Sequence, residues 1–230
     1  MSAYDAVAPM YDAWSADMVE DVGFYVDLAR EADGPIVELA VGSGRVAIPI
    51  AVRTGKRVIG IDSSHAMLAV ARERAAAAGV DLDLREGDMR DFALDEPAAL
   101  VYCPFRSLLH LPTWGDRRRV FERIAAALRP GGRFVWNAFV FDHRIAAELD
   151  GMWKDEPERH RNDYLPADNR IDITFGSGAA ISLWWVLRSE WEGLLDASGL
   201  ETEALHGWFD RRPFDESSRE FVWTARKPAA

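Results

Sequence analysis

A glycine-rich turn after a short apolar stretch holds the residues with the clearest chemical potential. Residues 36–46 (IVELAVGSGRV) predict a buried strand, a turn and the first turn of a helix. Gly42 and Gly44 permit positive φ and leave room for a ligand against the main chain. The acidic Glu38 lies at the end of the strand. A carboxylate there repels a phosphate and attracts a cation, so the turn favours a cationic ligand over a dinucleotide.

This turn is ambiguous by itself. Residues 42–44 followed by Ala47 also fit the dinucleotide-binding pattern. Asp62 ends the next predicted strand, 18 residues after the second glycine, and could hold two ribose hydroxyls in either case. Asp88 follows the third predicted strand, where its carboxylate could accept a hydrogen bond from an adenine amino group, with Met89 beside the ring. These acids extend a possible nucleoside site over three strand ends.

Strands and helices alternate through the first 140 residues, which predicts a parallel sheet with right-handed crossovers. Expected strands are 36–39, 57–62, 80–85, 98–102 and 134–139, and expected helices are 15–32, 46–53, 65–78 and 114–128. The pattern then changes. We expect an antiparallel hairpin over 171–175 and 180–187, a helix opened by a capping box at 189–192, and closing strands at 200–205 and 220–226.

The composition narrows the class of protein. The chain has 230 residues, 49% of them hydrophobic, which suits one α/β domain with a sizeable core. The net charge of −11 disfavours a nucleic-acid partner, because phosphate neutralisation needs clustered Lys and Arg. A single cysteine excludes an internal disulfide and a cysteine-based zinc site, so no metal is expected. With no apolar run of membrane-spanning length and no signal peptide, we expect a cytoplasmic protein without a membrane partner.

Five segments together resemble the class I S-adenosylmethionine-dependent methyltransferases. They are YDAVAPMYD near the N-terminus, ELAVGSGR, GID, GDMRDF and RPGGR, and the resemblance covers about residues 4–140. It implies a Rossmann-like, doubly wound α/β fold with a seven-stranded sheet, an antiparallel last strand and a small antiparallel cap after the fifth strand. The usual glycine and cysteine before the turn are Ala40 and Val41 here, and Ser43 replaces the usual threonine.

The resemblance also implies how the single domain 1–230 is divided and which residues form its sites. The parts are N-terminal lid helices 1–33, a cofactor-binding core 34–141, a substrate cap 142–188, and a C-terminal helix with closing strands 189–230. The residues implied at the S-adenosylmethionine site are Tyr4, Tyr11, Glu38, Gly42, Ser43, Gly44, Asp62, Ser63, Met67, Asp88, Met89 and Cys103. The residues expected near the substrate are Phe105, Arg106, Trp153 and Trp184. Tyr4 and Tyr11 resemble the lid tyrosines of small-molecule members, especially aminosugar N-methyltransferases.

Several of these residues have an alternative interpretation. His110, with Tyr11 as the other catalytic candidate, could act as a general base or could simply close a helix end. Arg106 could bind an anionic group of the substrate or pair with a neighbouring acid. The tryptophans could contact a substrate, although most aromatic side chains in such strands belong to the core. The run 117–119 is expected to be a solvated face of its helix.

The expected function is methyl transfer to a nitrogen or oxygen of a small-molecule acceptor in secondary metabolism, by a monomer or homodimer. The lack of a compelling base favours nitrogen or an acidic oxygen. A nicotinamide-dependent oxidoreductase is the first alternative, but the chain has only three lysines and none is well placed for a Tyr–Lys pair. A cofactor-binding domain that does not methylate is the second alternative.

Overall fold

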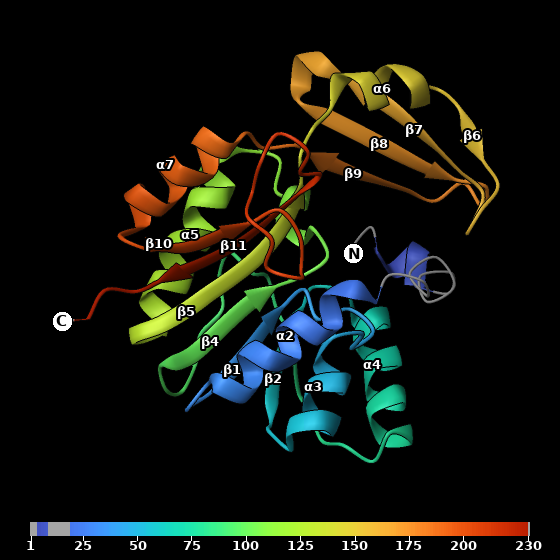
Figure 1. The fold of residues 1–230 in the computed structure, drawn as a ribbon. Coiled ribbons are helices and arrows are strands. Elements are labelled where there is room, and N and C mark those ends of the chain that lie inside the picture. Colours follow the sequence, from blue (N-terminus) through green and yellow to red (C-terminus); the bar gives the residue numbers. More distant parts are fainter. Residues whose placement is uncertain (1–3, 9–18, 230) are drawn as a thin grey trace.

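The computed structural model describes residues 4–8 and 19–229, and its centre is a seven-stranded sheet (Figure 1). The strand order is β10-β11-β5-β4-β1-β2-β3. These strands are β1 (Ile36–Leu39), β2 (Val58–Asp62), β3 (Asp83–Glu86), β4 (Ala98–Cys103), β5 (Leu128–Phe139), β10 (Glu201–His206) and β11 (Glu220–Arg226). Neighbours from β3 to β5 are parallel, whereas β11 is antiparallel to both β5 and β10. The predicted Rossmann-like sheet with an antiparallel last strand is confirmed.

Helices cover both faces of this sheet (Figure 1). On one face lie α2 (Glu20–Glu31), α3 (Ala47–Thr54) and α4 (His65–Ala77); on the other lie α5 (Trp114–Ala127) and α7 (Arg188–Ser198). Side chains alternate between the two cores along β4: Tyr102 joins the α2–α4 side, and its neighbour Cys103 joins the α5–α7 side. Gly55 ends α3 at a φ of 68°, and the Ser64 hydroxyl caps α4 by accepting from the Met67 N–H at 3.2 Å.

A separate small sheet follows β5 and is the antiparallel cap that the sequence predicted. It contains β6 (Trp153–Lys154), β7 (His160–Leu165), β8 (Arg170–Phe175) and β9 (Ala180–Trp184), in that spatial order, and is preceded by α6 (His143–Leu149). In Figure 1 it stands above the carboxyl end of the larger sheet, on the side of α4. Here "the cap" means α6 and β6–β9.

The structure corrects four details of the predicted elements. β5 begins at Leu128 instead of residue 134, because Lys227 and Gly132 pair their backbones across the end of β11. β3 begins at Asp83 instead of residue 80. The capping box of α7 lies two residues earlier than expected, with the Leu187 N–H donating to the Glu190 carboxylate at 2.9 Å.

The fourth correction concerns the arginine run 117–119. Arg117 is only 5% exposed, and its guanidinium donates to the carbonyl of Trp184, the last residue of β9, at 3.4 Å. Only the two arginines after it lie on the expected solvated face.

No helix in the described part of the chain is both long and apolar enough to cross a membrane.

Candidate active site

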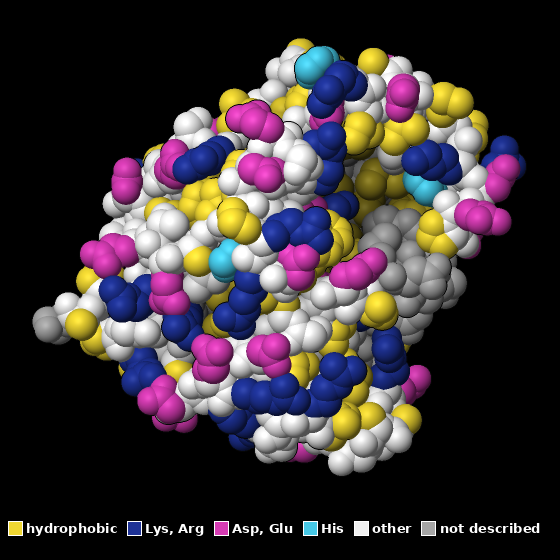
Figure 2. All heavy atoms as spheres, viewed as in Figure 1, with side chains coloured by type: hydrophobic (Ala, Val, Ile, Leu, Met, Phe, Trp, Pro, Cys, Tyr) yellow, Lys and Arg dark blue, Asp and Glu magenta, His cyan; other side chains and the backbone are white. Residues whose placement is uncertain are grey.

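A cavity of about 460 Å³ opens at the carboxyl ends of β1, β2 and β3, where parallel α/β sheets bind their ligands. One wall comes from the glycine turn, the end of β2 and the loop after β3. The opposite wall comes from residues 105–112 after β4, and from β9 of the cap. Figure 2 shows a hollow with hydrophobic side chains between the cap and the body of the molecule. The cavity therefore joins the predicted cofactor end of the sheet to the predicted substrate cap.

The two glycines of the turn have the positive φ that the sequence predicted, and Ala40 adopts the same conformation, which was not predicted. Ala40, Gly42 and Gly44 have φ values of 56°, 54° and 79°. A Cβ on Gly44 would lie 2.8 Å from the Ile48 side chain, so this glycine lets α3 pack against the turn. Ala40 and Gly42 line the cavity, and Gly44 does not.

Asp62 lies in the cavity wall with both carboxylate oxygens engaged by backbone groups. Oδ2 accepts from the Gly42 N–H and Oδ1 from the Ser64 N–H, each at 2.8 Å. Burial raises the pKa of Asp62, and hydrogen bonds from the backbone N–H groups of Ser64, Gly42 and Ser63 oppose that rise. Each oxygen keeps acceptor capacity for a further donor, which is what a pair of ribose hydroxyls needs. Ser63 lies beside it in the same wall.

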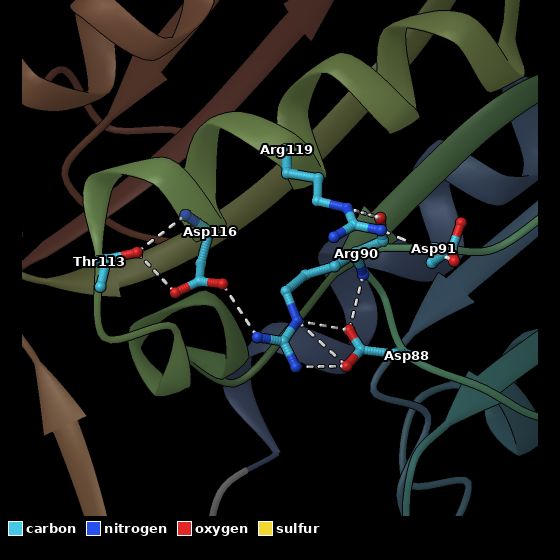
Figure 3. Close-up of polar contacts among 6 residues, drawn as sticks. All are labelled: Asp88, Arg90, Asp91, Thr113, Asp116 and Arg119. Atoms are coloured by element: carbon cyan, nitrogen blue, oxygen red, sulfur yellow. Dashed lines mark hydrogen bonds and ion pairs between the residues drawn. The ribbon is translucent and has the colours of Figure 1, made fainter.

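Asp88 also lines the cavity, but an arginine already holds its carboxylate (Figure 3). The Arg90 guanidinium donates to Asp88 at 2.6 Å and to Asp116 at 2.9 Å. Asp116 lies in the first turn of α5 and accepts a hydrogen bond from the Thr113 hydroxyl at 2.6 Å. The hydrogen bond from Arg90 lowers the pKa of Asp88. The loop after β3 is thereby tied to the start of α5, and an adenine amino group would share the Asp88 oxygens with Arg90.

His110 ends the short 3₁₀ helix η1 (Ser107–His110) and lies in the wall opposite these acids. Its Nδ1 is 3.0 Å from the Ser182 carbonyl oxygen, which can only accept, so Nδ1 carries the proton. Nε2 then accepts from the Tyr4 hydroxyl at 2.9 Å. Burial lowers the pKa of His110 to about 4. The imidazole is therefore neutral near pH 7 and joins residues from three parts of the chain.

Four of the residues predicted at the cofactor site lie behind the cavity walls: Glu38, Ser43, Gly44 and Cys103. Glu38 is buried and accepts from the Tyr102 hydroxyl at 2.7 Å, and burial raises its pKa to about 8. The Cys103 thiol is buried as well, and burial raises its pKa. Ser43 accepts from the Arg74 guanidinium at 2.9 Å.

The residues predicted near the substrate divide into two groups. Phe105 and Trp184 line the cavity. Arg106 points away from it and forms an ion pair with Glu220 at 2.8 Å, which is the second of the two interpretations of this residue. Trp153 lies on β6, away from the cavity walls, and its side chain is 43% exposed. Tyr11 falls outside the residues that the structure describes.

Of the remaining predicted residues, Tyr4, Met67 and Met89 line the cavity. Sequence reasoning missed Arg90 and the cap strand residues Ile181 and Ser182, which line it too. Arg90 stands within the motif GDMRDF and could have been found there. The position of β9 depends on how the cap packs, which no local pattern encodes. Among the described residues, no cluster of His, Cys, Asp and Glu is arranged to hold a metal ion.

Comparisons with known proteins agree with this geometry. Residues 36–132 match the model of a methyltransferase domain family. A dTDP-4-amino-2,3,4,6-tetradeoxy-D-glucose N,N-dimethyltransferase of Saccharopolyspora spinosa is 31% identical over 153 residues, which are 65% of this chain and 57% of that enzyme. The chain spans about half the length of the curated relatives it matches.

Two solved structures extend the likeness over nearly the whole chain. A methyltransferase from Streptomyces caelestis superposes with a TM-score of 0.82 and 25% identity, covering 100% of this chain and 99% of its own. An amino pentose methyltransferase from Micromonospora echinaspora, solved with S-adenosylmethionine bound, gives a TM-score of 0.69 and 23% identity, covering 99% and 97%. Both of these structures are methyltransferases, and neither comparison supports the oxidoreductase alternative. Over residues 36–132 the chain is thus similar to a methyltransferase domain family, and over its whole length it shares the fold of the Streptomyces caelestis methyltransferase.

Proposed function

We propose that the protein transfers a methyl group from S-adenosylmethionine to an amine nitrogen of a small molecule. The observation that carries this proposal is the continuous cavity, in which the strand-end acids of the cofactor side face Phe105, His110 and the cap. S-adenosylmethionine supplies an activated methyl group on a sulfonium when it is bound. The relative from Saccharopolyspora spinosa, an aminosugar N,N-dimethyltransferase by name, supports an amine as the acceptor.

The residues present fit such a cofactor. Asp62 offers buried carboxylate oxygens for the ribose hydroxyls, and Asp88 with Met89 forms the wall for the adenine. The main chain at Gly42 borders the cavity directly. Glu38 contributes from behind the wall: its buried carboxyl gains a charge when a cation approaches, which complements a sulfonium and an ammonium.

The contribution of the chain to the reaction is orientation and exclusion of water. Holding the two reactants in the correct orientation can lower the activation free energy of such a reaction by about 7–11 kcal/mol. With a pKa of about 4, His110 is a weak base, so it cannot hold the proton of an ordinary alcohol at neutral pH. An amine that arrives with a free lone pair needs no such base. The Tyr4–His110 pair then orients the acceptor, and nitrogen is favoured over a non-acidic oxygen.

Calorimetric titration with S-adenosylmethionine tests the cofactor site. We expect Asp62→Ala to lower the affinity at least tenfold, because two ribose hydroxyls lose their charged acceptor. Glu86→Ala is the matched control: Glu86 pairs with Asp62 across β2 and β3, but its side chain is exposed and contacts His65. The control should bind like the unmodified protein. Equal affinity of the Asp62 variant, or binding of NADH instead, would refute the proposal.

A further inference from the structure

The charges that line the cavity restrict which charged groups the acceptor can carry. Among the described residues that line the cavity, Arg90 is the one that carries a permanent positive charge, whereas Asp62 and Asp88 carry negative charges. The segments that the structure does not describe, 1–3 and 9–18, contain no Lys or Arg in their sequence. Among the described residues of the cavity walls, Arg90 is therefore the one whose permanent charge could neutralise a bound phosphate.

The charge of Arg90 is already balanced by two acids (Figure 3). Its Nε and Nη2 donate to Asp88 at 2.9 and 2.6 Å, and its Nη1 donates to Asp116 at 2.9 Å. A phosphate at this position would have to displace at least one carboxylate. The start of α5 offers no alternative, because Thr113 and Asp116 cap it: the Asp116 N–H donates to the Thr113 hydroxyl at 3.0 Å.

Other arginines of this region are held as well. Arg117, which is 5% exposed, donates to the Trp184 carbonyl at 3.4 Å, and two more are paired with acids. Arg106 contacts Glu220 at 2.8 Å, and in the cap Arg161 contacts Asp163 at 2.9 Å. Over residues 142–188 the sequence holds nine Asp and Glu against six Lys and Arg. Phosphate recognition in proteins depends on Lys and Arg whose charge is available, so this cap is a poor surface for a diphosphate.

The rest of the acceptor wall suits an uncharged or cationic group. Phe105, Trp184 and Ile181 supply aromatic and apolar surface, and the Tyr4–His110 pair is neutral. An amine gains a positive charge when it is methylated, and the nearby acids favour that charge.

We infer that the acceptor is an amine that carries no phosphate, and that the enzyme does not act on an amino sugar linked to a nucleoside diphosphate. This inference rests on the proposed function and makes it more specific. The relative from Saccharopolyspora spinosa differs in this respect, since its name gives a dTDP-linked sugar as the substrate. Methylation would accordingly follow the reactions that release or transfer the amine-bearing group from any nucleotide carrier.

Binding measurements on the full chain separate the two proposals. The protein is first titrated with S-adenosylhomocysteine; failure to bind at this step would refute the cofactor proposal. The loaded protein is then titrated with thymidine diphosphate up to about 2 mM. We expect no saturable binding, and saturable binding would overturn the inference while leaving the cofactor site intact. Ala180→Arg serves as the positive control, because Ala180 is exposed at the cavity edge and the variant adds a guanidinium there.

A methyl-transfer assay provides the second arm. Radiolabelled S-adenosylmethionine is offered with pairs of acceptors that share one amino sugar, as the methyl glycoside and as the thymidine diphosphate conjugate. We expect turnover of the glycoside to exceed that of the conjugate at least tenfold. Faster turnover of the conjugate overturns the inference, and if neither member reacts the binding arm decides alone.

Discussion

At the scale of single residues, Glu38 combines burial with a charge that the ligand-free protein stabilises poorly. Its folded-state pKa is raised to about 8, far above the value of an exposed glutamate. Between about pH 4.5 and 8 the folded state therefore keeps a proton that the unfolded state has lost, so this residue lowers stability progressively as the pH rises. Replacement by glutamine should remove that cost, because an amide can still accept from the Tyr102 hydroxyl.

We therefore expect Glu38→Gln to raise Tm by about 3 °C at pH 8 and to change it little at pH 4.5. The same variant should bind S-adenosylmethionine more weakly, since it lacks the carboxylate. In the unmodified protein, binding near pH 7 should release a proton, visible as an enthalpy that varies with the ionisation enthalpy of the buffer. A Tm that is lower at pH 8 than that of the unmodified protein would contradict this account of the residue.

Residues at strand ends could be predicted from the sequence, and residues with distant partners could not. Asp62 and Asp88 follow predicted parallel strands, whose carboxyl ends must share one edge of a sheet, and both line the cavity. Arg106 stands in the right segment, but Glu220 binds it from a strand 114 residues away. Nothing local distinguishes that ion pair from a free guanidinium. The same applies to Arg117, which is buried and donates to the carbonyl of Trp184, a residue 67 positions away in the sequence.

At the scale of elements, the turn after β4 determines where Phe105 lies. Phe105 and Arg106 have φ values of 57° and 63°, a conformation that costs non-glycine residues free energy. Glu220, which is 1% exposed, holds the turn through the Arg106 guanidinium, and the Asn137 amide donates to the same carboxylate at 2.6 Å. The Arg45 guanidinium lies 4.6 Å from the centre of the Phe105 ring. This ion pair, whose carboxylate is buried and whose guanidinium is partly exposed, thus stabilises a strained turn that presents an aromatic ring to the cavity.

Two substitutions of Arg106 distinguish the contribution of the ion pair to stability from the cost of the strained backbone. We expect Arg106→Ala to lower the free energy of unfolding by about 3 kcal/mol, because Glu220 loses its charged partner. Arg106→Gly loses the same partner but adopts positive φ readily, so it should be more stable than the alanine variant by about 1 kcal/mol. Urea unfolding measures both values. An alanine variant as stable as the glycine variant would show that the backbone is not strained there.

The boundaries of elements depended on long-range pairing as well. A Pro-Gly-Gly sequence predicts a turn, yet β5 begins before it: Leu128 and Arg133 both pair with β4, and the ladder is irregular between them. Backbone hydrogen bonds of the two glycines to Lys227 hold the intervening residues beside the end of β11. Residues 151–170 have a polar composition without a clear period; they form β7 by pairing with β8, and β6 by pairing with β7. Local sequence propensity was sufficient to predict the helices and the buried strands, whereas the first two strands of the cap depend on tertiary pairing that the local sequence does not encode.

At the scale of the whole molecule, the buried side chains of the described residues form three hydrophobic clusters, two within the main fold and one beside the cavity. Two of them fill the two faces of the seven-stranded sheet. The third joins the helical residues 4–8 to α4 and to the inner face of the cap, with Val7 fully buried against this cluster. Asp5 adds a polar contact to the same junction, accepting from the Ser64 hydroxyl at 2.6 Å. The third cluster borders the cavity with Met67 on its cofactor side and Ile181 on its cap side.

Because these clusters are separate, we expect that the packing of residues 4–8 beside the cavity can be disrupted without unfolding the seven-stranded sheet. Val7→Asp places a charge in the third cluster, so residues 4–8 should lose their packing against the cap and Met67. We expect at least tenfold weaker binding of S-adenosylhomocysteine by calorimetry, with Tm reduced by no more than about 3 °C. Val22→Asp is the matched control: Val22 lies on α2 in the cluster that fills one face of the seven-stranded sheet, so this variant should lower Tm much further. If both variants unfold at the same temperature, the junction belongs to the main core and the cavity cannot open independently of it.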